Sequence, residues 1–150
     1  MNFDIYTTKS KEAIQSAQQL MTQNHNPQLE QIHLLVALLQ QENGLVPQLL
    51  KKMDVTVESL QAAAEAELQK LPSISGSVDF DRVNADSSLV SALNAAENQA
   101  KTMKDEYVSV EHLFLAMLKQ PDKTLKELFK QYGITRESFL QALSTVRGNQ

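Results

Sequence analysis

Two of the three histidines, His33 and His112, are the residues of this 150-residue chain whose type and spacing could do chemistry. They lie 79 positions apart, each near the start of a strongly apolar stretch. Two imidazoles that converge can bind a metal ion, but such a site also needs carboxylates or a third imidazole. The pattern favours a structural histidine that occurs twice, with its ring bonded to the backbone near the opening turn of a helix. We therefore predict no metal site.

A catalytic triad could be assembled from Ser109, His112 and Asp105. Ser109, however, stands where the N-cap of a helix is expected, and no glycine-rich turn exposes its hydroxyl group. The chain has no cysteine, which removes disulfides, thiolate zinc sites and cysteine nucleophiles. The acidic residues form no recognisable general acid–base pair. We predict no catalytic residue.

Nucleotide chemistry is not expected within these residues either. A P-loop needs a glycine-rich turn and a lysine, which together hold phosphates against backbone N–H groups. The glycines stand alone in the sequence, at Gly44, Gly76, Gly133 and Gly148. We therefore expect no cofactor in this part of the chain.

The composition predicts a soluble, cytoplasmic domain rich in helices. Apolar residues make up 42% and charged residues 21%, and four glycines with four prolines leave few turns for an all-β fold. The apolar runs Leu34–Leu39 and Leu113–Leu118 are far shorter than the roughly 20 residues that cross a membrane. The first residues lack the pattern of a signal peptide. A net charge of −4 disfavours nucleic acid as a partner.

The chain contains an internal duplication. At an offset of 79 positions, Thr8–Glu65 aligns with Ser87–Ser144 without a gap. A turn at Gln131–Thr135 could belong to a DNA-binding helix-turn-helix, but Asp54–Glu58 replaces it in the first copy, so we interpret the turn as architectural. Identical pairs include Ala13/Ala92, Ala17/Ala96, His33/His112, Leu34/Leu113, Leu39/Leu118, Leu49/Leu128 and Glu58/Glu137.

Each copy has the pattern of four helices. The first helix carries one apolar stripe, and the second is apolar on nearly every side and must be buried. The expected helices of the first copy start near Thr8, cover about Glu30–Gln41, follow Asn43-Gly44 and open at Thr56, and those of the second copy cover Ser87–Lys104 and Ser109–Gln120, follow the cap Asp122 and open at Thr135.

We predict an all-α fold in which tandem duplicated four-helix repeats pack as one eight-helix domain with pseudo-twofold symmetry. Repeat 1 spans residues 1–70, a connector 71–84 and repeat 2 residues 85–146, and residues 147–150 begin a linker. Three connector residues are too apolar for a free linker and are expected to hold it across the two halves: Ile74, Val78 and Phe80.

Several strings, together with the duplication, resemble the amino-terminal domain of the Clp family of AAA+ unfolding machines. They are Met1–Lys9, Ile32–Leu35 and above all Val108–Leu118. Leu68–Pro72 and Val146–Gln150 are most similar to the ClpB-type disaggregases. The resemblance covers the entire chain.

The resemblance implies the front part of a longer protein. Its ATPase modules would use ATP and Mg²⁺, assemble as a hexamer and thread polypeptide through a pore. The domain itself, expected to be a monomer when isolated, would dock unfolded or aggregated polypeptides and in some relatives adaptor or co-chaperone proteins, with no nucleic acid and no membrane as partner.

The resemblance also places Thr7, Asp105 and Glu111 near the substrate-docking surface. Each has a structural alternative: Thr7 as a helix cap, Glu111 as a first-turn acid and Asp105 as a loop residue. An apolar floor beside them could come from parts of the first helix and from a second group of residues, Tyr107, Val108 and Val110.

Two other functions stay open. One is an adaptor-docking domain of a protease-coupled Clp unfoldase, which Leu71-Pro72 and Arg147-Gly148 disfavour. The other is a small metal-dependent enzyme, for which the two equivalent histidines are the sole argument.

Overall fold

A computed structural model describes residues 3–75 and 84–148, and these residues form eight α-helices preceded by a short 3₁₀ helix at Phe3–Ile5. The predicted all-α fold is confirmed, whereas the 3₁₀ helix was not expected. No helix in the described ranges is long and apolar enough to cross a membrane. The helices are α1 Thr8–Gln23, α2 Gln31–Gln40, α3 Leu45–Lys52, α4 Val57–Gln69, α5 Ser87–Thr102, α6 Val110–Lys119, α7 Lys123–Gln131 and α8 Arg136–Arg147.

The duplication is visible in the helix bounds. Adding 79 to the first and last residues of α1 and α2 gives the bounds of α5 and α6. Backbone strain repeats as well, because His25 and Lys104 both take a positive φ, of 54° and 60°, just after α1 and α5. The two copies therefore share their turns as well as their helices.

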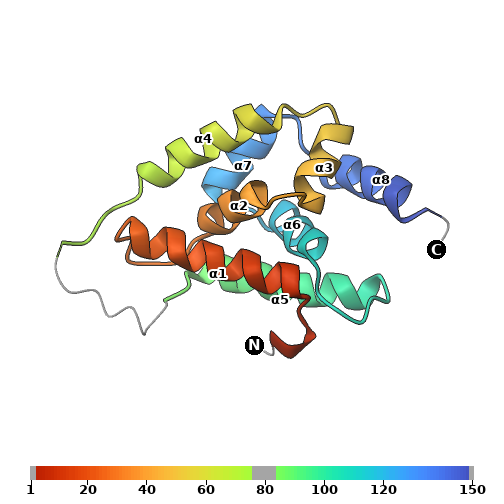
Figure 1. Ribbon diagram of the computed structural model, residues 1–150, viewed down its shortest axis with the longest axis horizontal. Helices are drawn as coiled ribbons and strands as arrows, with labels where there is room; N and C mark the ends of the chain where they lie inside the picture. The colour runs from red at the N-terminus through yellow and green to blue at the C-terminus, as the bar shows by residue number, and fades with distance from the viewer. Residues whose placement is uncertain (1–2, 76–83, 149–150) are drawn as a thin grey trace.

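The two central helices, α2 and α6, form the middle of the core and contact each other. Every residue from Gln31 to Leu39 and from Val110 to Met117 is buried. In Figure 1, α1 and α5 lie on one side of this pair, and the third and fourth helices of both repeats lie on the other. Packing there crosses between the repeats, since α3 contacts α8 and α4 contacts α7.

The repeats also exchange backbone hydrogen bonds in a reciprocal pattern. Tyr6 forms a parallel bridge with Val108, and Leu29 forms the equivalent bridge with Ala85. The Val108 N–H donates to the Ile5 carbonyl at 2.8 Å, as the Leu29 N–H donates to the Asn84 carbonyl at 2.9 Å. Each repeat thus depends on the other for backbone partners, which gives the domain its pseudo-twofold symmetry.

The described start of the connector is held by polar contacts to the end of α1. The Ile74 N–H donates to the His25 carbonyl at 2.8 Å, and Asn26 Nδ2 donates to the Pro72 carbonyl at 3.0 Å. The Ile74 side chain is 42% exposed, so the expectation that it holds the connector by apolar burial is wrong. Val78 and Phe80 lie outside the described residues.

We expect the two repeats to reassemble when they are produced as separate chains, 1–75 and 84–150. Each chain alone should lack most of its helical structure, because it leaves the crossed helix contacts and the exchanged hydrogen bonds without partners. Far-UV circular dichroism and sedimentation of the equimolar mixture should show a one-to-one complex close to the intact chain in helix content. Two halves that are each as helical and as stable alone as the intact chain would contradict this dependence.

Candidate functional site

The two equivalent histidines accept hydrogen bonds from the N-cap residues of the central helices. His33 Nδ1 accepts a hydrogen bond from the Glu30 N–H at 2.9 Å, and His112 Nδ1 accepts one from the Ser109 N–H at 2.8 Å. Because Nδ1 accepts, Nε2 carries the proton, and it donates to Asn26 in the first copy at 2.9 Å. The predicted structural role of both histidines is confirmed.

The second partner of each ring comes from the residue seven positions before it. In the second copy this residue is Asp105, whose Oδ2 lies 2.7 Å from His112 Nε2. The turn after the preceding helix sets its position, because a residue with positive φ, Lys104, lets the Asp105 N–H bond back to the Ala100 carbonyl at 2.9 Å. Asn26 is held by the same turn, with its N–H bonded to the Met21 carbonyl at 3.0 Å.

The two rings occupy different electrostatic environments. Burial lowers the pKa of His33 from 6.5 to about 4, and its partner Asn26 carries no charge that would stabilise an imidazolium ion. The ring is fully buried, so a charged form would also lose the bond from the Glu30 N–H. In the described ranges, no three residues of the types His, Cys, Asp and Glu are placed to hold a metal ion.

In the second copy the histidine partner belongs to an ion-pair network that reaches the end of α8. Arg147 Nη1 lies 3.0 Å from Asp105 Oδ2, and Arg147 Nη2 lies 3.0 Å from Glu111 Oε2. Partial burial would raise the pKa of Asp105, but hydrogen bonds from His112 and Arg147 outweigh it and hold that pKa below its usual value. Desolvation of Arg147 is likewise outweighed by hydrogen bonds to Glu111 and Asp105, which raise its pKa.

The structure therefore brings two of the predicted site residues together, because Asp105 and Glu111 share Arg147. Glu111 is only 7% exposed, so its carboxylate is no open rim acceptor. Thr7 is the N-cap of α1, accepting from the Ser10 N–H at 3.1 Å, and its own N–H donates to the Val108 carbonyl at 3.0 Å.

The predicted apolar floor is only partly available at the surface. Tyr107 is 54% exposed, as a binding residue requires. Val108 and Val110 are 1% and 5% exposed, so the expectation that they line an open floor is wrong. Val108 is drawn into the core by its bridge to Tyr6, and Val110 begins the buried helix α6.

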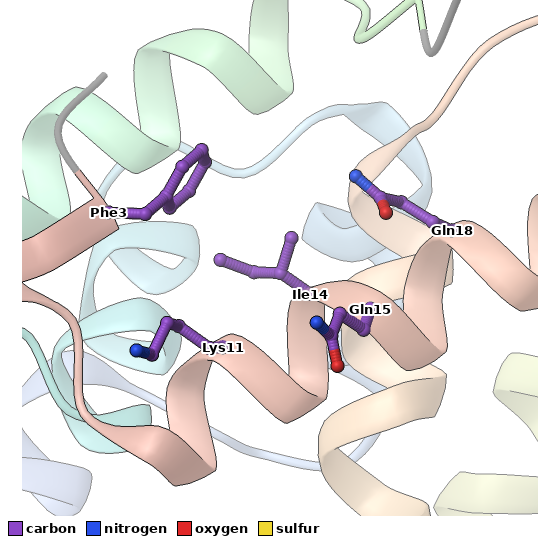
Figure 2. A pocket seen from close by; sticks show the side chains of 5 residues that line it. All are labelled: Phe3, Lys11, Ile14, Gln15 and Gln18. Carbon is purple, nitrogen blue, oxygen red and sulfur yellow. The ribbon is translucent and has the colours of Figure 1, made fainter. Parts of the chain in front are cut away.

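An open hollow of about 250 Å³ lies between the 3₁₀ helix and α1. Figure 2 shows the Phe3 ring facing α1, with Ile14 between Phe3 and Gln18. Lys11 and Gln15 complete the lining. Phe3 is 41% exposed and meets the Tyr6 ring edge-on, with ring centroids 5.1 Å apart. The hollow thus has an aromatic and aliphatic centre and a polar rim.

Parts of the first helix were expected in this site from the sequence, but Phe3 was not. The sequence signal for this site was the spacing of α1 residues at three and four positions along one face, together with an aromatic residue just before the helix.

A larger hollow, of about 580 Å³, lies between α1, α2 and α4. Polar groups of its wall bond one another, as Gln40 donates to Glu65 at 3.1 Å and Gln69 donates to Asn24 at 3.1 Å. The Phe3 hollow is therefore the better candidate for an apolar ligand.

Known proteins with related sequences share this arrangement of repeats. The family model of the Clp repeat (R) N-terminal domain matches residues 5–132. The ClpB chaperone of Bacillus cereus is 38% identical over 151 positions, covering 100% of this chain and 17% of that protein. The ClpB chaperone of Bdellovibrio bacteriovorus is 38% identical over 144 positions, covering 96% of this chain and 17% of that protein. The chain thus spans less than a fifth of the length of these relatives.

Solved structures share the fold. The Hsp104 N-terminal domain from Candida albicans has a TM-score of 0.84 at 24% identity, covering 97% of this chain and 93% of that one. A complex of the ClpV N-domain with a VipB peptide has a TM-score of 0.73 at 21% identity, covering 95% of this chain and 86% of that one.

We predict that stability falls as the pH drops from 6.5 toward 4, because the unfolded chain then binds a proton that buried His33 does not. The shift corresponds to a loss of about 3 kcal/mol. In Asn26→Asp, the new carboxylate beside Nε2 should raise the pKa of His33 and flatten this pH dependence. Chemical denaturation at several pH values measures the slope.

Asn94→Asp, which adds the same charge at an exposed position of α5, serves as the control. Asn26→Asp also loses the bond to the Pro72 carbonyl. An ionised carboxylate cannot donate to that carbonyl, whereas a protonated one can, so the slopes are compared above about pH 5, where the new carboxyl group is ionised. An unchanged slope in Asn26→Asp would show that His33 does not set the pH dependence.

Proposed function

Because the chain belongs to the Clp N-terminal repeat domain family, we propose that it docks unfolded or aggregated polypeptide for a ClpB-like disaggregase. In this proposal the domain binds the client and performs no reaction. ATP hydrolysis with Mg²⁺, hexamer assembly and threading belong to further modules of a longer protein.

The observation that carries the proposal is the hollow of exposed Phe3 over Ile14, with Lys11, Gln15 and Gln18 on its rim. An extended or helical client segment needs an apolar floor for its hydrophobic side chains and polar groups at the edge for its backbone. Phe3 is among the few large apolar side chains left exposed in the described ranges. Peptide binding by the ClpV N-domain, which shares this fold, supports a peptide as the occupant.

Binding through this hollow should be weak. Burial of about 400 Å² of apolar surface contributes on the order of 10 kcal/mol. Loss of translational freedom and ordering of the peptide cost roughly 4–15 kcal/mol, so the dissociation constant should be micromolar or weaker. A weak site releases its client readily, which suits a domain that passes polypeptide on.

An adaptor protein could use the same hollow with a defined segment. The VipB complex favours this second candidate, because the ligand of that ClpV N-domain is one particular peptide. The two candidates differ in sequence dependence, because an unfolded-chain receptor should accept many apolar segments of similar composition, whereas an adaptor site should lose binding when the order of residues in the segment is scrambled.

We predict that Phe3→Ser weakens binding of a permanently unfolded model protein about three- to tenfold, because it removes the aromatic wall of the hollow. The matched control is Ile74→Ser, since Ile74 is equally exposed, at 42% against 41% for Phe3. A fluorescence titration with reduced, alkylated lactalbumin measures the affinities. If Phe3→Ser and Ile74→Ser both bind as the unchanged chain does, the hollow is not the docking site.

A further inference from the structure

The residues that end α3 and α7 are equivalent in the two repeats and have the same backbone conformation. Met53 has φ and ψ of −86° and 8°, and Tyr132, 79 positions later, has −97° and 4°. The next residue takes a positive φ in both copies, 61° at Asp54 and 66° at Gly133. The backbone therefore places the two side chains equivalently, and the difference between the copies lies in the side chain itself.

Tyr132 joins the end of α7 to the start of α4. Its hydroxyl group lies 2.7 Å from Ser59 Oγ on the first turn of α4, and its ring is partly buried against the core. In this half of the molecule, a phenol ring held by its hydroxyl group therefore fills the junction between the end of a third helix and the fourth helix of the other repeat.

The equivalent junction in the other half, between α3 and α8, is open. With Met53 in place of the tyrosine, it holds a hollow of about 420 Å³, called the α3/α8 hollow below. Ligand pockets commonly have volumes of about 300–1,000 Å³. In Figure 1, α3 and α8 lie on the side of the α2 and α6 pair away from α1, so this hollow is separate from the Phe3 hollow. The lining residues are Lys52, Met53, Ser138, Gln141, Ala142 and Thr145.

The wall of the α3/α8 hollow offers hydrogen bonds that the filled junction does not need. Gln141 and Thr145 stand where α4 has Ala62 and Ala66. The Thr145 hydroxyl donates to the Ala142 carbonyl at 2.7 Å, so its oxygen keeps lone pairs that can accept from a ligand. Two polar side chains on the exposed wall of an otherwise apolar hollow favour a ligand that has both a ring and a hydroxyl group.

The edge of the α3/α8 hollow carries a positive charge. Lys52 lines it, whereas the equivalent residue of the filled junction, Gln131, is neutral. Lys51 stands beside Lys52 in the last turn of α3. A lysine at this place attracts an acidic side chain next to the ligand and also the face of an aromatic ring.

We propose that the α3/α8 hollow binds a tyrosine side chain of a partner protein, with an acidic residue beside that tyrosine. The bound ring takes the place that Tyr132 fills in the other half, its hydroxyl donates to Gln141 or Thr145, and the acidic neighbour pairs with Lys52. The site lies apart from the Phe3 hollow and does not depend on client docking there.

The first experiment is a titration of the full chain with the acetylated, amidated peptide Asp-Tyr-Asp, followed by the backbone amide signals in NMR. Shifts are expected at residues 52–54 and 138–145. The same peptide with leucine in place of tyrosine should bind about fivefold more weakly, because it lacks the ring and the hydroxyl group. Equal binding of the two peptides would contradict a tyrosine site.

Met53→Tyr should fill the hollow from within, as Tyr132 does in the other half. The variant should stay folded and bind the tyrosine peptide at least about tenfold more weakly than the unchanged chain. Met53→Leu is the matched control, because it conserves volume and leaves the hollow open. A folded Met53→Tyr chain that still binds the peptide as the unchanged chain does would overturn the site.

Tyr132→Met tests the same equivalence in reverse and needs no peptide. It should open a second hollow beside Ser59, so that p-cresol, the tyrosine side chain as a free molecule, shifts amides of residues 59–66 that it does not shift in the unchanged chain. Tyr132→Phe keeps the ring and should not open this hollow. A folded Tyr132→Met chain without the new p-cresol site would contradict the equivalence of the two junctions.

Lys52→Gln, which introduces the residue of the filled junction, should weaken binding of the acidic peptide about two- to fivefold and leave p-cresol binding unchanged. Lys51→Gln is the control of equal charge. If p-cresol binds the unchanged chain and the peptide does not, docking of a partner tyrosine is overturned. If the amides of the hollow shift on dilution of the chain alone, the occupant is a second copy and not a partner. Phe3→Ser should leave these titrations unchanged, so this site and the proposed docking function can fail separately.

Discussion

Burial of the two central helices is the constraint on which the rest of the structure depends. A helix surrounded on all sides cannot satisfy its terminal backbone groups with water, so internal side chains must do so. His33 and His112 supply this partner by accepting the N–H of the residue that precedes each helix. Each ring then needs a second partner, which fixes the preceding turn. The ends of α1 and α5, the starts of α2 and α6 and the reciprocal bridges between repeats are thereby locked together.

Because the chain is duplicated, the capping histidine occurs twice, and its second hydrogen-bond partner differs between the two copies. The same helix-ending turn presents Asn26 to His33 and Asp105 to His112. An amide satisfies the ring and adds no charge, whereas a carboxylate satisfies the ring and still has oxygen lone pairs for another cation. That spare capacity is what Arg147 uses. The network at the end of α8 can therefore arise without disturbing the buried helix beneath it.

Much of the fold could be predicted because its periodicities are local and occur twice. The all-round apolar character of Leu34–Leu39 required a buried helix, and the 79-residue offset carried that assignment to the second copy. Polar contacts between distant segments could not be predicted. Gln31 looks like a surface residue in the sequence, yet it is fully buried and bonds the Ser88 and Gln120 carbonyls at 3.0 and 2.9 Å. Val108 and Val110 were wrongly predicted as site residues for a related reason. An apolar residue type does not by itself indicate whether the side chain faces the core or the solvent.

The hollow and the Arg147 corner are joined through the bridged residues Tyr6 and Val108. Phe3 precedes Tyr6 by three residues, and Asp105 precedes Val108 by three, on segments that run parallel where they are bridged. Under the docking proposal, a client that contacts Phe3 therefore has exposed Tyr107, which directly precedes Val108, as a second contact on the neighbouring segment. Two weak contacts on one rigid body reinforce each other through effective concentration, and each can still be released separately. A client held by two weak contacts is therefore retained longer than by either contact alone. Release stays fast, because each contact is weak.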